Sequence, residues 1–299
     1  MPIPFKTDFD FEYGTPARLS PRIRRVIANN PGPFTFTGTG TYIIGNGAVA
    51  VIDPGPLMEQ HIDAICAALD PSETISHILI THTHLDHSPA AIPLKARTGA
   101  PIYGCTPPAP TQPDGVKLEE DADDTFRPDH IVAHGDILTG GDWSVECVHT
   151  PGHMSNHMCY ALREEKTLFT GDHVMGWSTS VIAPPDGNMR DYMASLDLLL
   201  TRDDALYWPT HGDSIDDPKP FVRAFIEHRR QREAQILARL EAGDTQITEI
   251  VAAIYTDTDP VLYPAAARSV LAHMEDLTER GVVACEGIVS LEARYSPLK

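Results

Sequence analysis

A short segment, residues 81–87, holds three histidines and one aspartate in the order Thr-His-Thr-His-Leu-Asp-His. Imidazole nitrogens and carboxylate oxygens are ligands that Zn²⁺ takes in catalytic sites, and imidazole also suits iron and nickel. A single histidine in such a segment is more often structural, but four potential ligands in this order indicate a metal site. The residues at 77–81 are largely apolar and predict a strand, whose rigid end would direct the ligands toward one point.

Three later segments repeat this arrangement, because each predicted strand runs into a loop that carries a histidine or an aspartate. Scaffolds of strands and helices commonly place binding and catalytic residues on such loops, since the strands hold the loop ends rigidly. We therefore expect four strand ends to deliver ligands to one site. The later candidates are His153 after the strand predicted over 144–149, Asp172 after 167–170, and His211 after 206–208.

The chain divides into two parts of different character. Residues 1–216 mix predicted strands and helices, and a Gly-Asn-Gly turn at 45–47 predicts a β-hairpin. Residues 217–299 predict three helices and a short hairpin that turns at Glu286-Gly287, an order that resembles a winged-helix module. Residues 106–129 are rich in proline and acidic residues and predict a surface insertion. Further strands are predicted over 42–44, 48–52, 101–104 and 158–162, helices over 57–69, 87–97, 189–200, 221–241, 245–255 and 264–280, and the last hairpin strands over 282–285 and 288–294.

The composition sets limits on the partners of this chain. It has 299 residues, a formal net charge of -19 and five widely spaced cysteines without a C-x-x-C motif. The negative charge argues against strong electrostatic binding of nucleic acid, although a metal could still hold an oligonucleotide locally. Dispersed cysteines in odd number indicate reduced thiols. No apolar stretch approaches the roughly 18 residues that span a membrane, and the start lacks a signal-peptide pattern, so we expect a cytoplasmic protein without membrane contact.

The pattern His-x-His-x-Asp-His, followed in order by histidine, aspartate and histidine, resembles the metallo-β-lactamase superfamily over residues 20–215. The resemblance implies an α+β fold, a four-layer αββα sandwich with a dinuclear metal site at one edge. Asp53, in the sequence Val-Ile-Asp-Pro-Gly, matches the family's first motif, which implies that it orients the ligand loops rather than binding metal. The ligands implied are His82, His84 and His153 for the first metal, Asp86, His87 and His211 for the second, and Asp172 as the bridge.

This resemblance also implies an activity, that of a metal-dependent hydrolase. Two divalent ions, with Zn²⁺ expected and Fe or Mn also fitting the ligands, would activate a shared hydroxide. The bond attacked would belong to an ester or a phosphodiester. Asp86 would act catalytically as well as bind metal, because it could orient the water or carry a proton. His157 could line the substrate pocket, although a histidine held by internal hydrogen bonds fits that position equally well.

Within the superfamily, the whole chain most resembles the β-lactamase-like protein 2 group, whose members include a metal-dependent endoribonuclease for single-stranded RNA. The resemblance rests on Asn-Pro-Gly-Pro-Phe-Thr at 30–35, on the segment 176–198 and on the C-terminal helices. True β-lactamase activity is not expected, because the resemblance puts an aspartate, Asp172, at the bridging position that the lactamases fill with other residue types.

Two alternative functions remain open on this fold. The first is a thioester hydrolase similar to hydroxyacylglutathione hydrolase, whose substrate contacts would come from basic residues of the C-terminal helices. The second is an iron-dependent sulfur dioxygenase or a non-catalytic binder, although a mononuclear oxygenase would not need every ligand of the second metal. Candidate substrate contacts for the thioester hydrolase are Arg223, Arg229, Arg230 and Arg232, which could equally form a solvated helix face.

The C-terminal module lacks the positive charge expected of a nucleic-acid-binding domain. Its helix over 264–280 carries three acidic residues against Arg268 and Arg280. We therefore expect the module to form a pocket wall or a homodimer contact, and the substrate to be a small molecule or an oligonucleotide held mainly by the metals. The three acidic residues are Glu275, Asp276 and Glu279.

Overall fold

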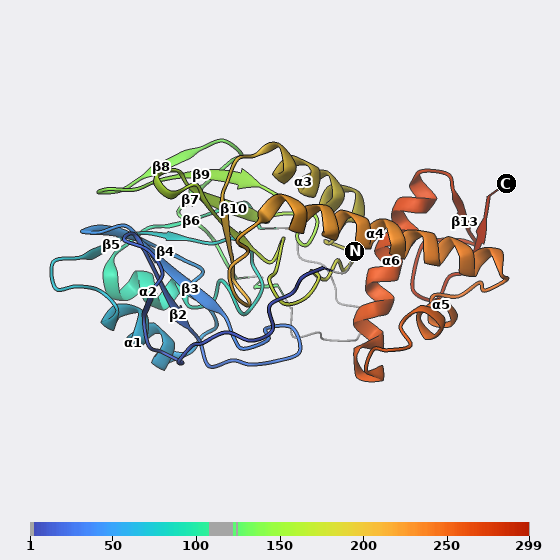
Figure 1. The fold of residues 1–299 in the computed structure, drawn as a ribbon, viewed down its shortest axis with the longest axis horizontal. Coiled ribbons are helices and arrows are strands. Elements are labelled where there is room, and N and C mark those ends of the chain that lie inside the picture. The colour runs from blue at the N-terminus through green and yellow to red at the C-terminus, as the bar shows by residue number, and fades with distance from the viewer. Residues whose placement is uncertain (1–2, 108–121, 124, 299) are drawn as a thin grey trace.

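Two β-sheets form the centre of the larger part of the molecule in the computed structural model, which describes residues 3–107, 122–123 and 125–298 (Figure 1). The seven-stranded sheet is antiparallel from β1 to β4 and parallel from β4 to β7. In the five-stranded sheet, β11 and β12 are parallel and the other neighbours are antiparallel. In order, the first sheet contains β1 (Ala17–Arg18), β2 (Ile23–Ile27), β3 (Gly40–Ile44), β4 (Ala48–Ile52), β5 (Thr74–Leu79), β6 (Ile102–Gly104) and β7 (His130–Ile131), and the second contains β12 (Leu206–Pro209), β11 (Thr167–Gly171), β10 (Met158–Leu162), β9 (Ser144–His149) and β8 (Ile137–Thr139).

Alternation along the strands builds two separate apolar layers. Successive side chains of a strand point to opposite faces of the sheet. In β4, Ala50 and Ile52 join the core between the two sheets, together with Tyr160 and Phe169 of the second sheet. Their neighbour Val51 joins the core under the helices on the outer face. A sheet with both faces covered explains why β4 is almost continuously apolar.

Helices cover the outer faces of both sheets and complete four layers, α, β, β and α. Helices α1 (Glu59–Ala67) and α2 (Ala91–Thr98) pack on the first sheet through a core that includes Ile62 and Leu94. Helices α3 (Met189–Thr201) and α4 (Pro218–Glu241) cover the second sheet. This arrangement confirms the predicted α+β sandwich.

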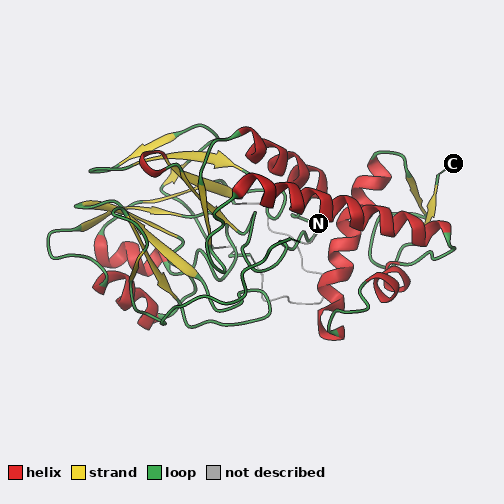
Figure 2. Cartoon of the chain, in the orientation of Figure 1, coloured by secondary structure: helices red, strands yellow, loops and turns green. Residues whose placement is uncertain are grey.

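A smaller module follows and lies to one side of the sandwich (Figure 2). It contains α5 (Ile247–Ile254), α6 (Tyr263–Glu279) and the antiparallel pair β13 (Val283–Cys285) and β14 (Tyr295–Pro297). The start of α5 is fixed by a capping box between Gln246 and Glu249, which satisfies amide groups that the helix itself leaves free. Single turns of 3₁₀ helix occur at Arg163–Glu165 and Pro260–Leu262.

The predicted boundary between the two parts, at 216/217, lies just before α4, yet α4 contributes to both cores. Phe221 and Phe225 are buried with the helix-covered face of the second sheet. Ile236 and Leu240, near the other end of the same helix, are buried among α5 and α6. The domain limits stay a prediction, and the packing shows that one helix connects the two hydrophobic cores.

Several element predictions are corrected by the structure. The strand that pairs with β13 is β14, not 288–294, because Tyr295 Oη donates to Ser290 O and accepts from Ser290 N, which closes that segment into a loop. Helix α2 begins at Ala91 rather than at 87, which leaves 87–90 in the ligand loop. Most of the insertion predicted at 106–129 lies outside the described residues. None of the described helices is long and apolar enough to cross a membrane.

Candidate metal centre

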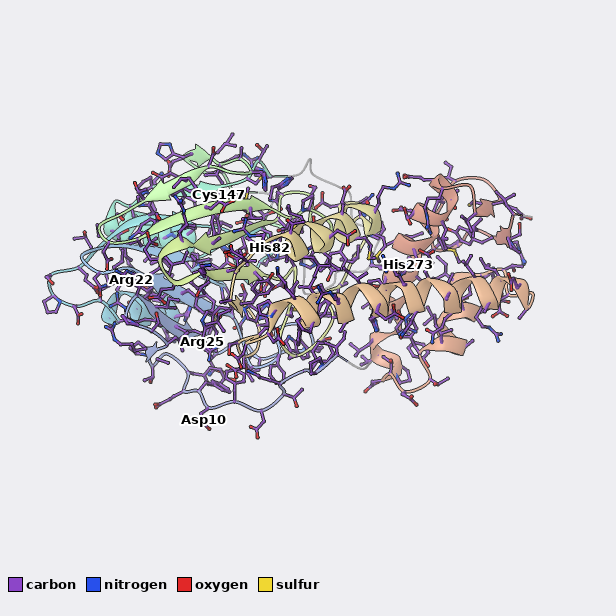
Figure 3. All side chains as sticks on the ribbon, turned by 45° about the horizontal axis from the view of Figure 1, so that its top comes forward. Asp10, Arg22, Arg25, His82, Cys147 and His273 are labelled. Atoms are coloured by element: carbon purple, nitrogen blue, oxygen red, sulfur yellow. The ribbon has the colours of Figure 1, made fainter. Side chains whose placement is uncertain are left out.

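The candidate ligands come from the ends of four strands, as the sequence predicts. The loop after β5 carries His82, and the loops after β9, β11 and β12 carry His153, Asp172 and His211. The two sheets are tied together beside this loop, because Met158 N donates to Thr81 O at 2.7 Å. The four loops therefore bring these buried side chains together at one edge of the sandwich. Figure 3 labels one of them, His82.

Three imidazoles form the first donor group. Nε2 of His82 lies 2.9 Å from Nδ1 of His84, and Nε2 of His153 lies 3.1 Å from the same atom. All three residues are buried. Their donor atoms lie within 4.8 Å of one another, a spacing that could hold one ion.

The ring nitrogens that face away from this group fix the tautomers of His82 and His153. Nδ1 of His153 lies 2.6 Å from Val181 O, so it must carry the proton that it donates to this carbonyl. Thr81 Oγ1 donates to Asp53, so it accepts from Nδ1 of His82, 3.0 Å away. Neutral rings held in this way turn unprotonated Nε2 atoms toward His84. Two lone pairs directed at one point fit a bound cation.

The second donor group combines carboxylates with two further imidazoles. Nε2 of His211 lies 3.0 Å from Oδ2 of Asp86, and Nε2 of His87 lies 3.4 Å from the same oxygen. Asp172 faces both groups, with Oδ1 3.5 Å from Nε2 of His87 and Oδ2 3.9 Å from Nε2 of His153. It therefore has the position that a bridging ligand requires.

Buried polar atoms without well-directed partners mark the second group as a place for a cation. Within the described residues, Nε2 of His87, Nε2 of His211 and Oδ1 of Asp172 make no well-directed hydrogen bond, although they lie near one another or near Asp86. Such atoms are costly to bury unless something satisfies them. The opposite nitrogen of each ring is already used, since Nδ1 of His87 lies 2.9 Å from Asp53 and Nδ1 of His211 lies 3.1 Å from Gly38 O. The residue set therefore fits the implied pair of divalent ions.

Asp53 holds the ligand loops and does not reach the donor groups. Its carboxylate accepts hydrogen bonds from Thr81 N at 2.8 Å, Thr81 Oγ1 at 2.7 Å and Thr210 Oγ1 at 3.1 Å, and it orients His87. Its φ of 48° is unusual for a residue other than glycine and is often found at functional sites. This geometry matches the supporting position implied by the resemblance.

His157 is fully buried behind the ligands, and both of its ring nitrogens are engaged. Nδ1 lies 2.9 Å from Thr150 Oγ1, and Nε2 accepts from the backbone N–H of Asp172 at 3.2 Å. This geometry favours a role in positioning Asp172 over the predicted contact with substrate.

The partners of the ligands are what the sequence analysis missed. Thr81, Thr210 and the carbonyl groups of Gly38 and Val181 each bond a ligand or Asp53. One signal was available, because threonine directly precedes both His82 and His211 in the sequence. Backbone carbonyl groups give no such signal, since every residue has one.

The charges of the two groups differ. Burial lowers the pKa of His84 to about 3, and it also lowers the pKa of His82 and His153, so the first group is held in the neutral, ligating form. Burial would also lower the pKa of His87, but the carboxylates of Asp86 and Asp172 raise it well above its usual value. The second group therefore attracts positive charge strongly.

Comparisons with known families and relatives agree with this geometry. Residues 35–211 match the Metallo-beta-lactamase superfamily, and residues 247–290 match the Beta-lactamase associated winged helix domain. The first match ends at His211, the last candidate ligand, and covers more than half of the chain.

Relatives extend the likeness to both parts of the chain. A beta-lactamase-like protein 2 homolog from Caenorhabditis elegans is 30% identical over 89% of this chain and 87% of its own length. An atrochrysone carboxyl ACP thioesterase from Cryptosporiopsis sp. (strain 8999) is 33% identical over 77% of this chain and 66% of its own length. A beta-lactamase domain protein from Burkholderia ambifaria shares the fold over 97% of this chain, with a TM-score of 0.81 at 18% identity. The chain belongs to the metallo-β-lactamase superfamily, with a C-terminal winged-helix module of the kind associated with that family.

Proposed function

We propose that this protein is a hydrolase that binds two divalent metal ions and cleaves an ester or a phosphodiester. The observation that carries the proposal is the position of Asp172, whose two oxygens face separate groups of imidazole nitrogens. The ligand assignment is part of the proposal. His82, His84 and His153 would hold one ion, Asp86, His87 and His211 the other, and Asp172 would contact both.

The protein's own residues define how such a site would work. Two divalent ions would act as Lewis acids and lower the pKa of a shared water molecule, and Zn²⁺ suits the nitrogen-rich donor set. Asp86 is the most exposed of the candidate ligands, with 15% of its side chain accessible, whereas the side chain of Asp172 is only 6% accessible. A carboxylate at the open side is placed to accept a proton or to orient water.

Thioester hydrolysis is the second candidate activity within the same mechanism. It is favoured by the relative named as an acyl carrier protein thioesterase, which is 33% identical to this chain. The formal net charge of -19 also favours small acyl substrates over a polyanion that must be attracted from solution. The dioxygenase alternative uses a single metal, and it leaves the donor group of Asp86, His87 and His211 without a role.

A substrate panel on protein of measured metal content tests the proposal. The panel contains a thioester, a lactone, a simple phosphodiester, single-stranded RNA and a β-lactam. We expect metal-dependent hydrolysis of an ester or phosphodiester and no turnover of the β-lactam. Rapid thioester cleavage without nuclease activity would select the second candidate. Metal-loaded protein that hydrolyses none of the compounds, yet consumes O₂ to oxidise a persulfide when it is loaded with iron, would contradict both.

A further inference from the structure

The C-terminal helices hold a loop of the sandwich by its backbone. This loop, residues 172–188, lies between β11 and α3. The guanidinium of Arg229, on α4, donates through Nη2 to Ser180 O. On α6, Arg268 Nη1 donates to Pro184 O at 3.2 Å. Figure 3 shows α4 extending from the sandwich, where His82 is labelled, to the module that contains His273.

The same loop orients one candidate ligand. The carbonyl of Val181, the residue after Ser180, accepts from Nδ1 of His153 at 2.6 Å. The loop is also fixed from the other side, because Ser180 Oγ and Tyr192 Oη both donate to His173 O at 2.9 Å. One peptide segment thus contacts the C-terminal helix on one side and an imidazole of the donor group on the other.

Arg229 is a buried charged residue without an acidic partner among the described residues, which is unusual for a position that serves packing alone. The residue is 4% exposed and has no ion pair with an acidic side chain among the described residues. Its charge is offset by Ser180 O and by the ring of Tyr192, whose centroid lies 5.2 Å away. Burying a charge without a counter-charge is costly, and an apolar residue would usually fill such a space more stably. The arginine does what an apolar residue could not, because it holds the carbonyl of Ser180 in place.

We propose that Arg229 is a positioning residue for the metal centre. By fixing the peptide at Ser180 it fixes Val181 O, and that carbonyl in turn sets the tautomer and the direction of the His153 ring. Groups that hydrogen-bond a metal ligand directly affect metal affinity about 10–100-fold when they are lost. Arg229 acts one step further from the metal, through the peptide at Ser180. This inference rests on the proposed role of His153 as a ligand, and it gives the C-terminal module a part in building the site.

The chain offers a matched control on the same helix. Arg232 makes the same kinds of contact as Arg229, since its Nη1 donates to Ile254 O at 3.2 Å and its guanidinium lies 4.0 Å from the ring centroid of Tyr255. Those contacts are to the end of α5 and not to the loop. Arg232→Met therefore removes a partly buried arginine with the same kinds of contact, without touching the support of His153.

The test measures Zn²⁺ affinity of the full-length protein by competition with a chelator, alongside thermal unfolding of the metal-free form. We expect Arg229→Met to weaken binding of one Zn²⁺ about 10-fold, the lower end of the range for groups that bond a ligand directly. Arg229→Lys, which keeps a charged donor, should recover part of the loss. Arg232→Met should bind Zn²⁺ within about 2-fold of the unaltered protein, even if its Tm falls. In a His153→Ala background, Arg229→Met should have no further effect on affinity.

The outcomes separate this inference from the proposed function. If His153→Ala binds two Zn²⁺ ions as tightly as the unaltered protein, the ligand assignment is wrong. If His153→Ala loses an ion while Arg229→Met keeps full affinity, the positioning role alone is overturned. Should Arg229→Met show no cooperative unfolding, Arg229→Gln replaces it and is judged by the same affinities, because its shorter side chain also lacks the guanidinium.

Discussion

The buried histidines of this protein differ in what their outer nitrogens contact. Rings that donate Nδ1–H to a fixed acceptor, such as His87 to Asp53 and His153 to Val181 O, turn Nε2 toward the metal centre. His61 is equally buried, but its Nε2 donates to Thr41 Oγ1 and it faces no other donor group. The direction of the free lone pair, more than burial or type, separates a candidate ligand from a structural histidine.

Replacing Asp172 tests the two-metal arrangement at its centre. We expect Asp172→Ala to lower the metal content per chain and to abolish hydrolysis, because a single carboxylate faces both donor groups. Metal can be counted by elemental analysis and turnover measured on the substrates that the unaltered protein cleaves. Full activity in this variant would rule out a mechanism that needs both ions.

His61 provides a pH prediction away from the ligands. Burial lowers its pKa from 6.5 to about 4. Between these values the unfolded chain binds a proton that the folded chain does not, so the free energy of unfolding falls as the pH drops from 6.5 to 4. The full loss is on the order of 3 kcal/mol. In the metal-free protein, the stability difference between the unaltered chain and His61→Gln should therefore shrink on acidification over this range.

A control and a contrary result accompany this pH prediction. His61→Gln should bind as much metal as the unaltered protein, because His61 contacts neither donor group. Urea denaturation at several pH values gives the two stability curves. Parallel curves between pH 6.5 and 4 would show that His61 does not titrate as its burial indicates.

At the residue scale, the sequence predicts the donors better than their supports. The spacing of His82, His84 and Asp86 is distinctive enough to indicate a site without a structure. The support of His153 by Val181 O depends on how a loop 28 residues further along folds back, which no local pattern encodes. From the sequence alone, His157 fits a substrate contact and a structural role equally well. Its contact with the backbone amide of Asp172 favours the structural role.

At the scale of elements, β9 and β10 are predicted accurately, whereas β2, which carries buried charge, and the short strands β1, β7 and β8 are not. The strands over 144–149 and 158–162 match β9 and β10 residue for residue. Strand β2 was not predicted, because its centre is Arg24-Arg25. Both arginines are buried, and Arg24 Nη1 lies 2.6 Å from Glu73 Oε2. A partner 49 residues away makes this strand possible, so its own sequence does not reveal it.

The shared helix α4 leads to a prediction about stability. Leu240 is 3% exposed and lies in the core of the C-terminal module, whereas Leu57 is 71% exposed. Leu240→Ala should lower the free energy of unfolding by about 2–5 kcal/mol, because it leaves a cavity. Leu57→Ala, the same chemical change at the surface, should stay within about 0.5 kcal/mol. Urea denaturation measures both, and equal effects would contradict the assigned core.

At the scale of the whole molecule, charge sets an expectation about nucleic acid. The formal net charge is -19, and two divalent ions would offset only a small part of it. We expect weak binding of single-stranded RNA with little dependence on salt, since few phosphates would be neutralised by basic side chains. Fluorescence anisotropy at 50 and 200 mM salt measures this dependence. A steep loss of affinity with increasing salt would reveal a basic surface and favour nuclease activity.

The overall architecture was predicted through family resemblance, because composition alone gives only size, charge and the absence of long apolar stretches. The α+β sandwich and the winged-helix module are both confirmed. All five cysteines lie in the described part and are free, as dispersed thiols predict. The predicted homodimer and the cytoplasmic setting stay predictions.

Helix α4 also limits where the chain could be divided between its two parts. A division at 216/217 would remove the helix that covers the second sheet, and with it Phe225 and Arg229. A point near Gly243, just after α4 ends, would leave that cover intact. Gly243 has a φ of 104°, and a Cβ there would meet no neighbour within 4 Å, so the turn is an open one. A module that began there would, however, lose Ile236 and Leu240 from its own core, so neither point separates the sandwich from the C-terminal module without opening a core.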